Sequence, residues 1–421
     1  MAFSVFGLLP SLLQMPRMMR LALIGIVCWV QAVPAENWPQ FRGPRGDGTS
    51  HETNAPLRWG AAQNVKWKAP LPGEGHSSPI VWEQSVFITA ADESGGRSLM
   101  RLDATTGKIL WQKKVAAAAK ESMHRENNSA SSTPVTDGAR VITSFQVGDR
   151  VDLRCFDLDG KQLWAVQPLR FDGEHGYGYS PIIYNDLVLF DCRQEGEAAL
   201  LALDKRTGSV RWRATPGNKR ISHVTPLLIT YGGQVQLVVS GSDETRSYNP
   251  NDGQPIWWCR GPSDVAVAGL VFGDGMVFAA AGYPDRTRMA VRVNGRGDVT
   301  KTHVAWSLRR QVTYVPSPVY YKGHVYSVID EGMLCCFDAQ TGQSKWEHRL
   351  GGRFRSSLLL AGDRIYATND KGLTTVFEAN PHQFRALASN DLGEFCYATP
   401  AISNGRMFVR TGSNLFCLAQ D

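Results

Sequence analysis

A set of histidine, tyrosine and arginine side chains falls at equivalent places in the sequence. Four of them each stand three residues before the proline or leucine of a short apolar segment: His76, His223, Arg355 and Tyr397. Segments of the same class contain His124, His175, Tyr179 and Tyr314, together with Arg125, Tyr177 and Arg353. Imidazole, phenol and guanidinium groups on one concave surface would make a ligand-binding site. The alternative is that they bond only to neighbouring turns.

The same segments give less support to covalent catalysis or metal binding than to ligand binding. Serine or threonine precedes the apolar segment in six copies: Ser78, Thr133, Ser180, Thr225, Ser317 and Thr399. Recurring strand geometry explains six copies better than catalysis does. A metal between His76 and His223 is disfavoured, because these residues belong to the first and fourth of the repeats described below. We therefore assign no catalytic residue and no metal ligand.

A hairpin that ends in tryptophan recurs along the chain and sets the positions of these loops. Its copies are ALDKRTGSVRW (202–212), RLDATTGKILW (101–111) and CFDAQTGQSKW (336–346), with looser versions at 155–164 and 247–257. The aspartate can accept hydrogen bonds from turn N–H groups, and the glycine permits a positive φ. We expect the indoles to pack between neighbouring repeats: Trp67, Trp111, Trp164, Trp212, Trp257, Trp306 and Trp346. Residues 377–387 depart from the pattern, with neither Thr-Gly nor Trp.

Eight strand–turn–strand segments precede these hairpins, and no long stretch after the N-terminus has helical periodicity. The pattern predicts an all-β, eight-bladed β-propeller of four-stranded antiparallel blades. The last repeat contains only three of the four expected strands. Residues 64–71, with Trp67 at the tryptophan position, are expected to supply its fourth strand and close the ring. Within each blade the strands are called a to d, from the axis outward. The d–a connections, which join the last strand of one blade to the first strand of the next, would then carry the polar residues above to one face of the ring.

The sequence divides into an N-terminal signal, a short clasp segment and the propeller. Residues 1–35 resemble a cleaved signal peptide, because Arg17 and Arg20 precede an apolar run too short to span a bilayer comfortably. An uncleaved anchor is the alternative. Residues 36–63 would form a clasp in which Trp38 and Phe41 pack on the propeller, and residues 64–421 would form the propeller itself. The protein is therefore expected to be exported to the periplasm or cell envelope.

Charge and cysteine content narrow the choice of partners. The net charge of +6 is mild and scattered, which argues against nucleic acid. Seven cysteines remain after residue 35, and no spacing among them suggests zinc. Cys335 and Cys336 are adjacent and are expected on opposite faces of one strand. We expect a monomer with a protein, peptide or glycan partner and no membrane span after removal of the signal.

The hairpin Ala-x-Asp-x-x-Thr-Gly-x-x-x-Trp resembles the tryptophan-docking repeat of pyrroloquinoline quinone (PQQ) dehydrogenases and of an outer-membrane assembly lipoprotein. A closer resemblance is to a family of exported bacterial PQQ-like propeller-repeat proteins, through NWPQFRGPRGDGTS (37–50), AGYPDR (281–286) and NDLGEFCYATPAIS (390–403). This resemblance implies the fold but no single activity. The docking repeat packs blades and does not itself imply quinone binding.

Two functions follow from the resemblance and the loop residues. The first is a non-catalytic binding scaffold with a partner on the loop face near the axis and no cofactor. The second is a compact dehydrogenase with PQQ and calcium, which would need a cluster of carboxylates and cationic groups. The loop acids are instead scattered and expected at solvated hairpin tips: Asp92, Glu93, Asp149, Glu195, Asp243, Asp285, Asp330 and Asp370.

Overall fold

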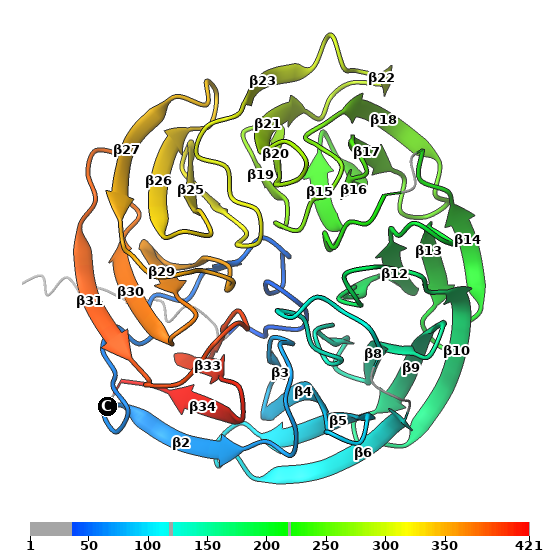
Figure 1. The fold of residues 1–421 in the computed structure, drawn as a ribbon, viewed down its shortest axis with the longest axis vertical. Coiled ribbons are helices and arrows are strands. Elements are labelled where there is room, and N and C mark those ends of the chain that lie inside the picture. Colours follow the sequence, from blue (N-terminus) through cyan, green and yellow to red (C-terminus); the bar gives the residue numbers. More distant parts are fainter. Residues whose placement is uncertain (1–35, 118–120, 218–219, 421) are drawn as a thin grey trace, which may run out of the picture. The chain divides into compact units, whose positions relative to one another are not determined.

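The computed structural model describes residues 36–117, 121–217 and 220–420, all within the second of two units, Pro34–Asp421. These residues form eight antiparallel sheets placed around one axis, as Figure 1 shows. The predicted all-β, eight-bladed propeller is therefore confirmed. None of the described segments forms a helix long and apolar enough to cross a membrane. The signal peptide predicted for residues 1–35 lies outside the described residues.

Each of the first four blades runs from a short inner strand a to an outer strand d. Blade 1 consists of β3 (Ile80–Trp82), β4 (Ser85–Ala91), β5 (Gly96–Asp103) and β6 (Ile109–Ala117). Blade 2 consists of β7 (Val135–Thr136), β8 (Arg140–Val147), β9 (Arg150–Asp157) and β10 (Gln162–Arg170). Blade 3 consists of β11 (Ile182–Tyr184), β12 (Leu187–Cys192), β13 (Ala199–Asp204) and β14 (Val210–Ala214). Blade 4 consists of β15 (Leu227–Tyr231), β16 (Gln234–Gly241), β17 (Glu244–Tyr248) and β18 (Pro255–Arg260).

The last four blades follow the same order. Blade 5 consists of β19 (Val271–Gly273), β20 (Met276–Ala281), β21 (Thr287–Arg292) and β23 (Val304–Leu308). Blade 6 consists of β24 (Val319–Tyr321), β25 (His324–Val328), β26 (Met333–Asp338) and β27 (Ser344–Arg349). Blade 7 consists of β28 (Leu359–Ala361), β29 (Arg364–Thr368), β30 (Leu373–Glu378) and β31 (Ala386–Asp391). Blade 8 consists of β32 (Ala401–Ser403), β33 (Arg406–Arg410), β34 (Asn414–Leu418) and β2 (Val65–Pro70).

Blade 8 joins the two ends of the propeller. Strand β2 pairs antiparallel with β34, and Trp67 lies opposite Cys417. The expected closure of the last blade by residues 64–71 is therefore confirmed. Closing the ring in this way pairs a strand edge that would otherwise be open.

Six indoles each connect one blade to the next blade in the ring. The N–H donates to a backbone carbonyl in the c–d turn of the following blade, at 2.9 to 3.1 Å, in these pairs: Trp67 to Ala104, Trp111 to Leu158, Trp164 to Lys205, Trp212 to Pro250, Trp306 to Ala339 and Trp346 to Asn380. The glycine of the receiving turn also matters. A Cβ on Gly208, whose φ is +75°, would lie 2.8 Å from the Trp164 ring. The Thr-Gly turn and the tryptophan of the preceding blade therefore form one contact.

Trp257 departs from the expected pattern, because the c–d loop of blade 5, between β21 and β23, is longer than the turns that receive the other indoles. The longer c–d loop of blade 5 instead adds strand β22 (Gly297–Asp298) beside β18, and Trp257 is fully buried. Its N–H donates to Oε1 of Gln236 in its own blade, at 2.8 Å. The Gln236 amide then donates to the carbonyl of Val293 in blade 5, at 3.1 Å. The hydrogen bond between these blades is thus relayed through one side chain.

Blade 7 has no tryptophan in its outer strand, and the N-terminal segment supplies one. Ala388 lies opposite Val376, where an indole stands in other blades, and blade 8 has no c–d turn to receive one. Trp59 packs in the same cluster as Ala388 and stacks on Tyr366 with ring centroids 6.3 Å apart. Its backbone N–H donates to Oδ1 of Asn390 at 3.0 Å, which fixes the segment on blade 7.

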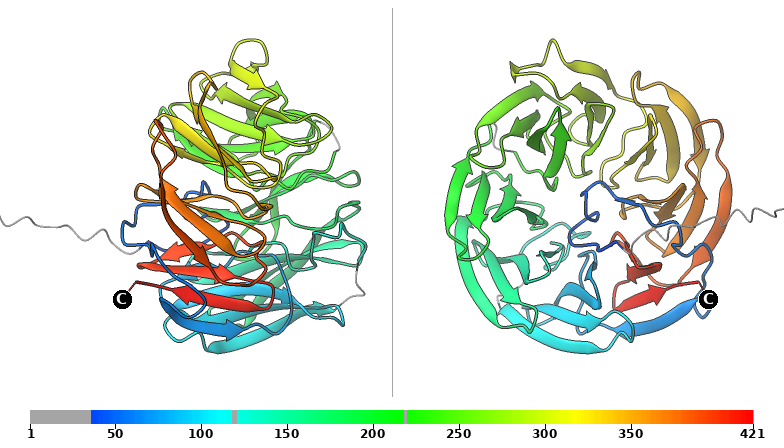
Figure 2. Two further views of the ribbon diagram at one scale, coloured as in Figure 1. Left: turned by 60° about the vertical axis from the view of Figure 1, so that its left-hand side comes forward. Right: turned by 180° about the vertical axis from the view of Figure 1, so that it is seen from behind.

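The rest of residues 36–63 crosses the ends of the inner strands, as the blue segment in the right-hand view of Figure 2 shows. Trp38 is fully buried and exchanges backbone hydrogen bonds with Val81 at 2.8 Å. Strand β1 (Thr49–Ser50) pairs in parallel with β28. The Glu52 carboxylate accepts the backbone N–H groups of Asn404 and Gly405 at 2.6 and 2.7 Å. These contacts place the segment on the a–b turns, opposite the d–a connections.

All seven cysteines of the described part of the chain are buried and carry no disulfide. Cys335 and Cys336 both lie in β26. Burial raises the pKa of each of these two thiols to about 12, so both are protonated at neutral pH. They pack as small apolar side chains.

Candidate functional site

A cavity of about 340 Å³ lies at the axis, where the d–a connections of all eight blades meet. Its lining comprises one or more residues from every blade and Phe41 from the N-terminal segment. The volume is at the lower end of the ~300–1,000 Å³ typical of small-ligand sites. We call it the axial cavity.

Seven of the eight residues proposed from the sequence line the axial cavity: His76, His124, His175, His223, Tyr314, Arg355 and Tyr397. Tyr179 does not, and is 2% exposed within the core of blades 2 and 3. Its hydroxyl donates to the Arg193 carbonyl. The cause is strand-like alternation, since the neighbouring Gly178 and Ser180 both face the cavity. Tyr177 is likewise buried in that core.

A ring of hydroxyl groups lies deeper, at the start of the inner strands. In five contacts a backbone N–H donates to the hydroxyl of the next blade, at 2.8 to 3.1 Å: Ser78 to Thr133, Thr133 to Ser180, Gly269 to Ser317, Ser317 to Ser357 and Ser357 to Thr399. Linking adjacent blades at the axis gives the recurring hydroxyls a structural role.

Phe41 reaches the axial cavity from the opposite face of the ring. The next residue, Arg42, is 1% exposed and donates through Nη2 to the carbonyls of Asp47 and Pro318, both at 2.5 Å. Burial lowers the pKa of Arg42 to about 10, partly offset by the charge of Asp47. These contacts hold Phe41 in place, so the N-terminal segment contributes a wall of the cavity.

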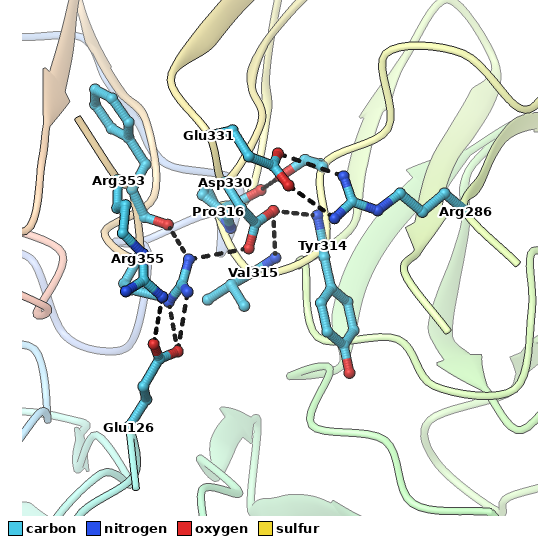
Figure 3. Close-up of polar contacts among 11 residues, drawn as sticks. Glu126, Arg286, Tyr314, Val315, Pro316, Asp330, Glu331, Arg353 and Arg355 are labelled. Atoms are coloured by element: carbon cyan, nitrogen blue, oxygen red, sulfur yellow. Dashed lines mark hydrogen bonds and ion pairs between the residues drawn. The ribbon is translucent and has the colours of Figure 1, made fainter. Parts of the chain in front are cut away.

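Ion pairs cross the mouth of the cavity, as Figure 3 shows. Glu126, on the loop before blade 2, bonds Arg353 and Arg355 on the loop before blade 7. Arg355 also bonds Asp330 at 3.2 Å, and Asp330 accepts the backbone N–H of Tyr314 at 2.9 Å. Carboxylates therefore satisfy the charge of Arg355 on two sides.

Asp330 is not the solvated turn residue that we expected. It is 8% exposed and lines the cavity, because its turn folds inward over the loop that carries Tyr314. Burial raises the pKa of Asp330 above its ordinary value, against the backbone hydrogen bonds and the charge of Arg355, which lower it. Its neighbour Glu331 points outward and pairs with Arg286 at 2.9 Å.

Two of the cavity histidines are neutral at pH 7. Burial lowers the pKa of His76 to about 4, with a smaller contribution from Arg410. Burial lowers the pKa of His223 to about 4 as well, helped by His175. Nδ1 of His223 is buried and has no hydrogen-bond partner in the described structure. The cavity thus offers neutral imidazoles and aromatic rings beside a paired set of charges.

Several cavity residues were not predicted from the sequence. Glu126 and Asn127 directly follow the candidates His124 and Arg125 in the same loop, so their place near the axis could have been inferred from these neighbours. Ser357 stands at the same step as the six recurring hydroxyls, and that pattern could have identified it. Within the described ranges, no group of three or more His, Cys, Asp or Glu residues has a geometry that could hold a metal.

Comparison with known proteins identifies the family. A family model described as outer membrane protein assembly factor BamB matches residues 59–167, 196–316 and 304–383. BamB of Burkholderia pseudomallei (strain K96243) is 22% identical over 296 residues, which cover 68% of this chain and 59% of that protein. This chain therefore matches less than two thirds of that relative.

Two solved structures share the fold. BamB from Moraxella catarrhalis has a TM-score of 0.60 and 14% identity, covering 85% of this chain and 99% of that one. A europium-containing methanol dehydrogenase has a TM-score of 0.50 and 12% identity, covering 91% of this chain and 98% of that one. Because the family model matches well over half of its residues, this chain belongs to the family described as outer membrane protein assembly factor BamB.

Proposed function

We propose that this protein is an exported, non-catalytic binding scaffold, monomeric by itself, which holds a partner protein on the d–a loop face by inserting a partner side chain into the axial cavity. The observation that carries the proposal is the cavity itself. Its walls come from eight blades, and the side chains at equivalent loop positions differ from one another. A family described by a role in protein assembly is consistent with a protein partner.

The chemistry of the cavity favours a neutral aromatic group. Phe41, Tyr314 and Tyr397 supply ring surfaces, and the neutral imidazoles of His76 and His223 can accept hydrogen bonds. The charges of Glu126, Asp330 and Arg355 are directed at one another. A tyrosine or tryptophan side chain, with one polar hydrogen and an apolar ring, matches this lining.

We propose further that the cavity does not take PQQ with calcium. The quinone carries several carboxylates, which would need cationic partners. Among the described residues that line the cavity, Arg355 is the sole lysine or arginine, and two carboxylates already engage it. Calcium takes 6–8 oxygen ligands, with carboxylates prominent, whereas Asp330 and Glu126 are held apart by Arg355.

The test uses N-acetyltyrosinamide as a probe of the cavity, with binding followed by ligand-detected NMR. We expect saturable binding that is lost in Gly178→Leu, which fills the cavity. A Cβ at this position lies 3.6 Å from its nearest neighbour, an ordinary contact, so the variant should fold. Gly60→Leu is the matched control, since a Cβ there meets only Gln63 at 3.9 Å.

Two results would overturn the proposal. One is equal probe binding by wild type and Gly178→Leu. The other is saturable binding of PQQ with Ca²⁺, accompanied by dye-linked oxidation of an alcohol, which would establish an enzyme in place of a scaffold.

A further inference from the structure

A second concavity, of about 880 Å³, lies beside the axial cavity on the same face. Its walls come from the loop before β3, the β4–β5 turn, the loop before β7 and the loop before β32. We call it the blade 1 groove. Three residues, His76, Asn127 and Tyr397, line both the groove and the axial cavity. A single ligand can therefore occupy both spaces.

The groove carries an excess of negative charge. Glu74, Asp92 and Glu93 line it, against a single guanidinium from Arg125, and all four side chains are exposed. In the described part of the chain, the Glu74 and Glu93 carboxylates have no hydrogen bond or ion pair. Asp92 uses one oxygen to accept from Ser94 and from the N–H of Gly96, at 2.6 and 2.7 Å. The whole chain has a charge of +6, so this groove is a local reversal of sign.

An aromatic surface adjoins these acids. The Phe395 ring is 47% exposed, which is uncommon for so large an apolar side chain. It packs against Tyr397 with ring centroids 4.2 Å apart, and Tyr397 contacts His76 at 4.9 Å. Met123 adds a flexible apolar side chain on the other side of the groove. The groove thus places apolar contacts next to unpaired carboxylates.

We infer that the blade 1 groove binds an extended, basic peptide segment of the partner protein, whose lysine or arginine side chains face Glu74 and Glu93 while a neighbouring aromatic side chain enters the axial cavity. This inference rests on the proposed function, because it specifies the chemistry of that partner. Charge complementarity selects the occupant. An acidic peptide or a phosphate-bearing ligand would meet more negative than positive groups in the lining, with three carboxylates against Arg125. Lysine and arginine side chains also have methylene stems that can cover Phe395 and Met123.

The experiment measures fluorescence anisotropy with a labelled hexapeptide of alternating lysine and tyrosine. The matched peptide has glutamate in place of lysine. The test variant is Glu74→Gln with Glu93→Gln, and the control is Glu83→Gln with Asp159→Asn. The control removes two exposed charges from the a–b and c–d turns on the opposite face. Thermal melting verifies that both variants are folded.

We expect the lysine peptide to bind wild type and the glutamate peptide not to bind. Two exposed charge pairs contribute little each, so the groove variant should bind about threefold to tenfold more weakly than the control variant. The difference should shrink at high salt, because screening acts on exposed charges. Equal affinities for the two peptides, or for the two variants, would overturn the inference.

The same measurements separate this inference from the proposed function. If Gly178→Leu abolishes peptide binding and the groove variant does not alter it, the groove assignment fails and the axial cavity stands. If charge dependence is found but N-acetyltyrosinamide does not bind the cavity, the groove stands without the cavity. A cationic chitosan hexamer that binds with this charge dependence, in place of the lysine peptide, would contradict the peptide assignment in favour of a glycan.

Discussion

Equivalent positions in most blades carry the same residue at the outer edge of the ring, but different residues at the mouth of the axial cavity. At the outer edge, six indoles donate to the next blade at 2.9 to 3.1 Å. At the mouth of the axial cavity, equivalent loops carry histidine, arginine or tyrosine. Repetition serves contacts between identical units, whereas a binding site needs different groups pointing at one centre. The comparison therefore separates residues that hold the ring from residues available for binding.

The exceptions at the outer edge show what the repeated contact requires. Trp257 faces the long c–d loop of blade 5, and Gln236 relays its hydrogen bond. Blade 7 faces a blade without any c–d turn, and Trp59 comes from the N-terminal segment to fill the gap. The indole contact depends on a short receiving turn rather than on its Thr-Gly pair, since the blade 7 turn lacks that pair and still accepts from Trp346 at 2.9 Å.

The largest effect is expected for Trp257→Ala. This indole is fully buried, and truncating a buried tryptophan costs about 3–5 kcal/mol of unfolding free energy. The partly buried Trp212 should lose less unfolding free energy on the same substitution. Urea unfolding followed by circular dichroism measures both values. A smaller loss for Trp257→Ala than for Trp212→Ala would contradict the importance of full burial at this contact.

The second largest loss of unfolding free energy is expected when the hydrogen-bond relay through Gln236 is removed. Gln236→Leu leaves the Trp257 N–H, the Ser247 hydroxyl and the Val293 carbonyl without their partner, and we expect a loss of about 2–4 kcal/mol. Trp257→Phe removes the indole N–H alone. In a double-mutant cycle the combined loss should be smaller than the sum by at least about 0.5 kcal/mol. Strict additivity would show that the relay carries no coupling.

The third prediction concerns His76 and His223 of the axial cavity, which should make the free energy of unfolding depend on pH below neutrality. His76 and His223 have pKa values of about 4 when folded, below the value of about 6.5 for free histidine. Between these values the unfolded state binds more protons, so stability falls as pH falls, by at most about 1.4 kcal/mol per pH unit for each imidazole. His76→Gln with His223→Gln should flatten this dependence. Substituting the exposed His382 is the control, and an unchanged slope in the double variant would contradict the assignment.

The smallest effect is expected for Glu126→Gln. The substitution weakens two ion pairs at the mouth, but Arg355 keeps its bond to Asp330. Partly exposed pairs contribute little, so the loss should stay below about 1 kcal/mol in thermal unfolding. A loss as large as that of Trp212→Ala would mean that the mouth also holds the ring, and the contrast between the two regions would not stand.

Much of the fold was predictable because its signals are local and repeated. The repeats placed six tryptophans, and the missing fourth strand of the last blade led to the seventh, Trp67, which lies opposite Cys417. Seven of the eight loop candidates line one cavity, and their role in binding stays a prediction. Tyr179 lies in the core instead, because side chains alternate along the segment and its neighbours Gly178 and Ser180 take the positions that face the cavity. Asp330 was misjudged because its burial depends on a neighbouring loop.

The amino-acid sequence by itself determined the number of blades and the contact between c–d turns and tryptophans, because periodicity and turn chemistry act within tens of residues. It also determined the closure of the ring, because the last repeat lacks the one strand that residues 64–71 can supply. Only the tertiary structure decided that Glu126 meets Arg353 and Arg355 across the mouth, and that Phe41 contributes a wall of the cavity. Glu126 is more than two hundred residues from Arg353 and Arg355 in the sequence. Phe41 belongs to a segment on the opposite face of the ring. Their meeting follows from the closed circle of sheets, which brings eight unlike loops to one axis.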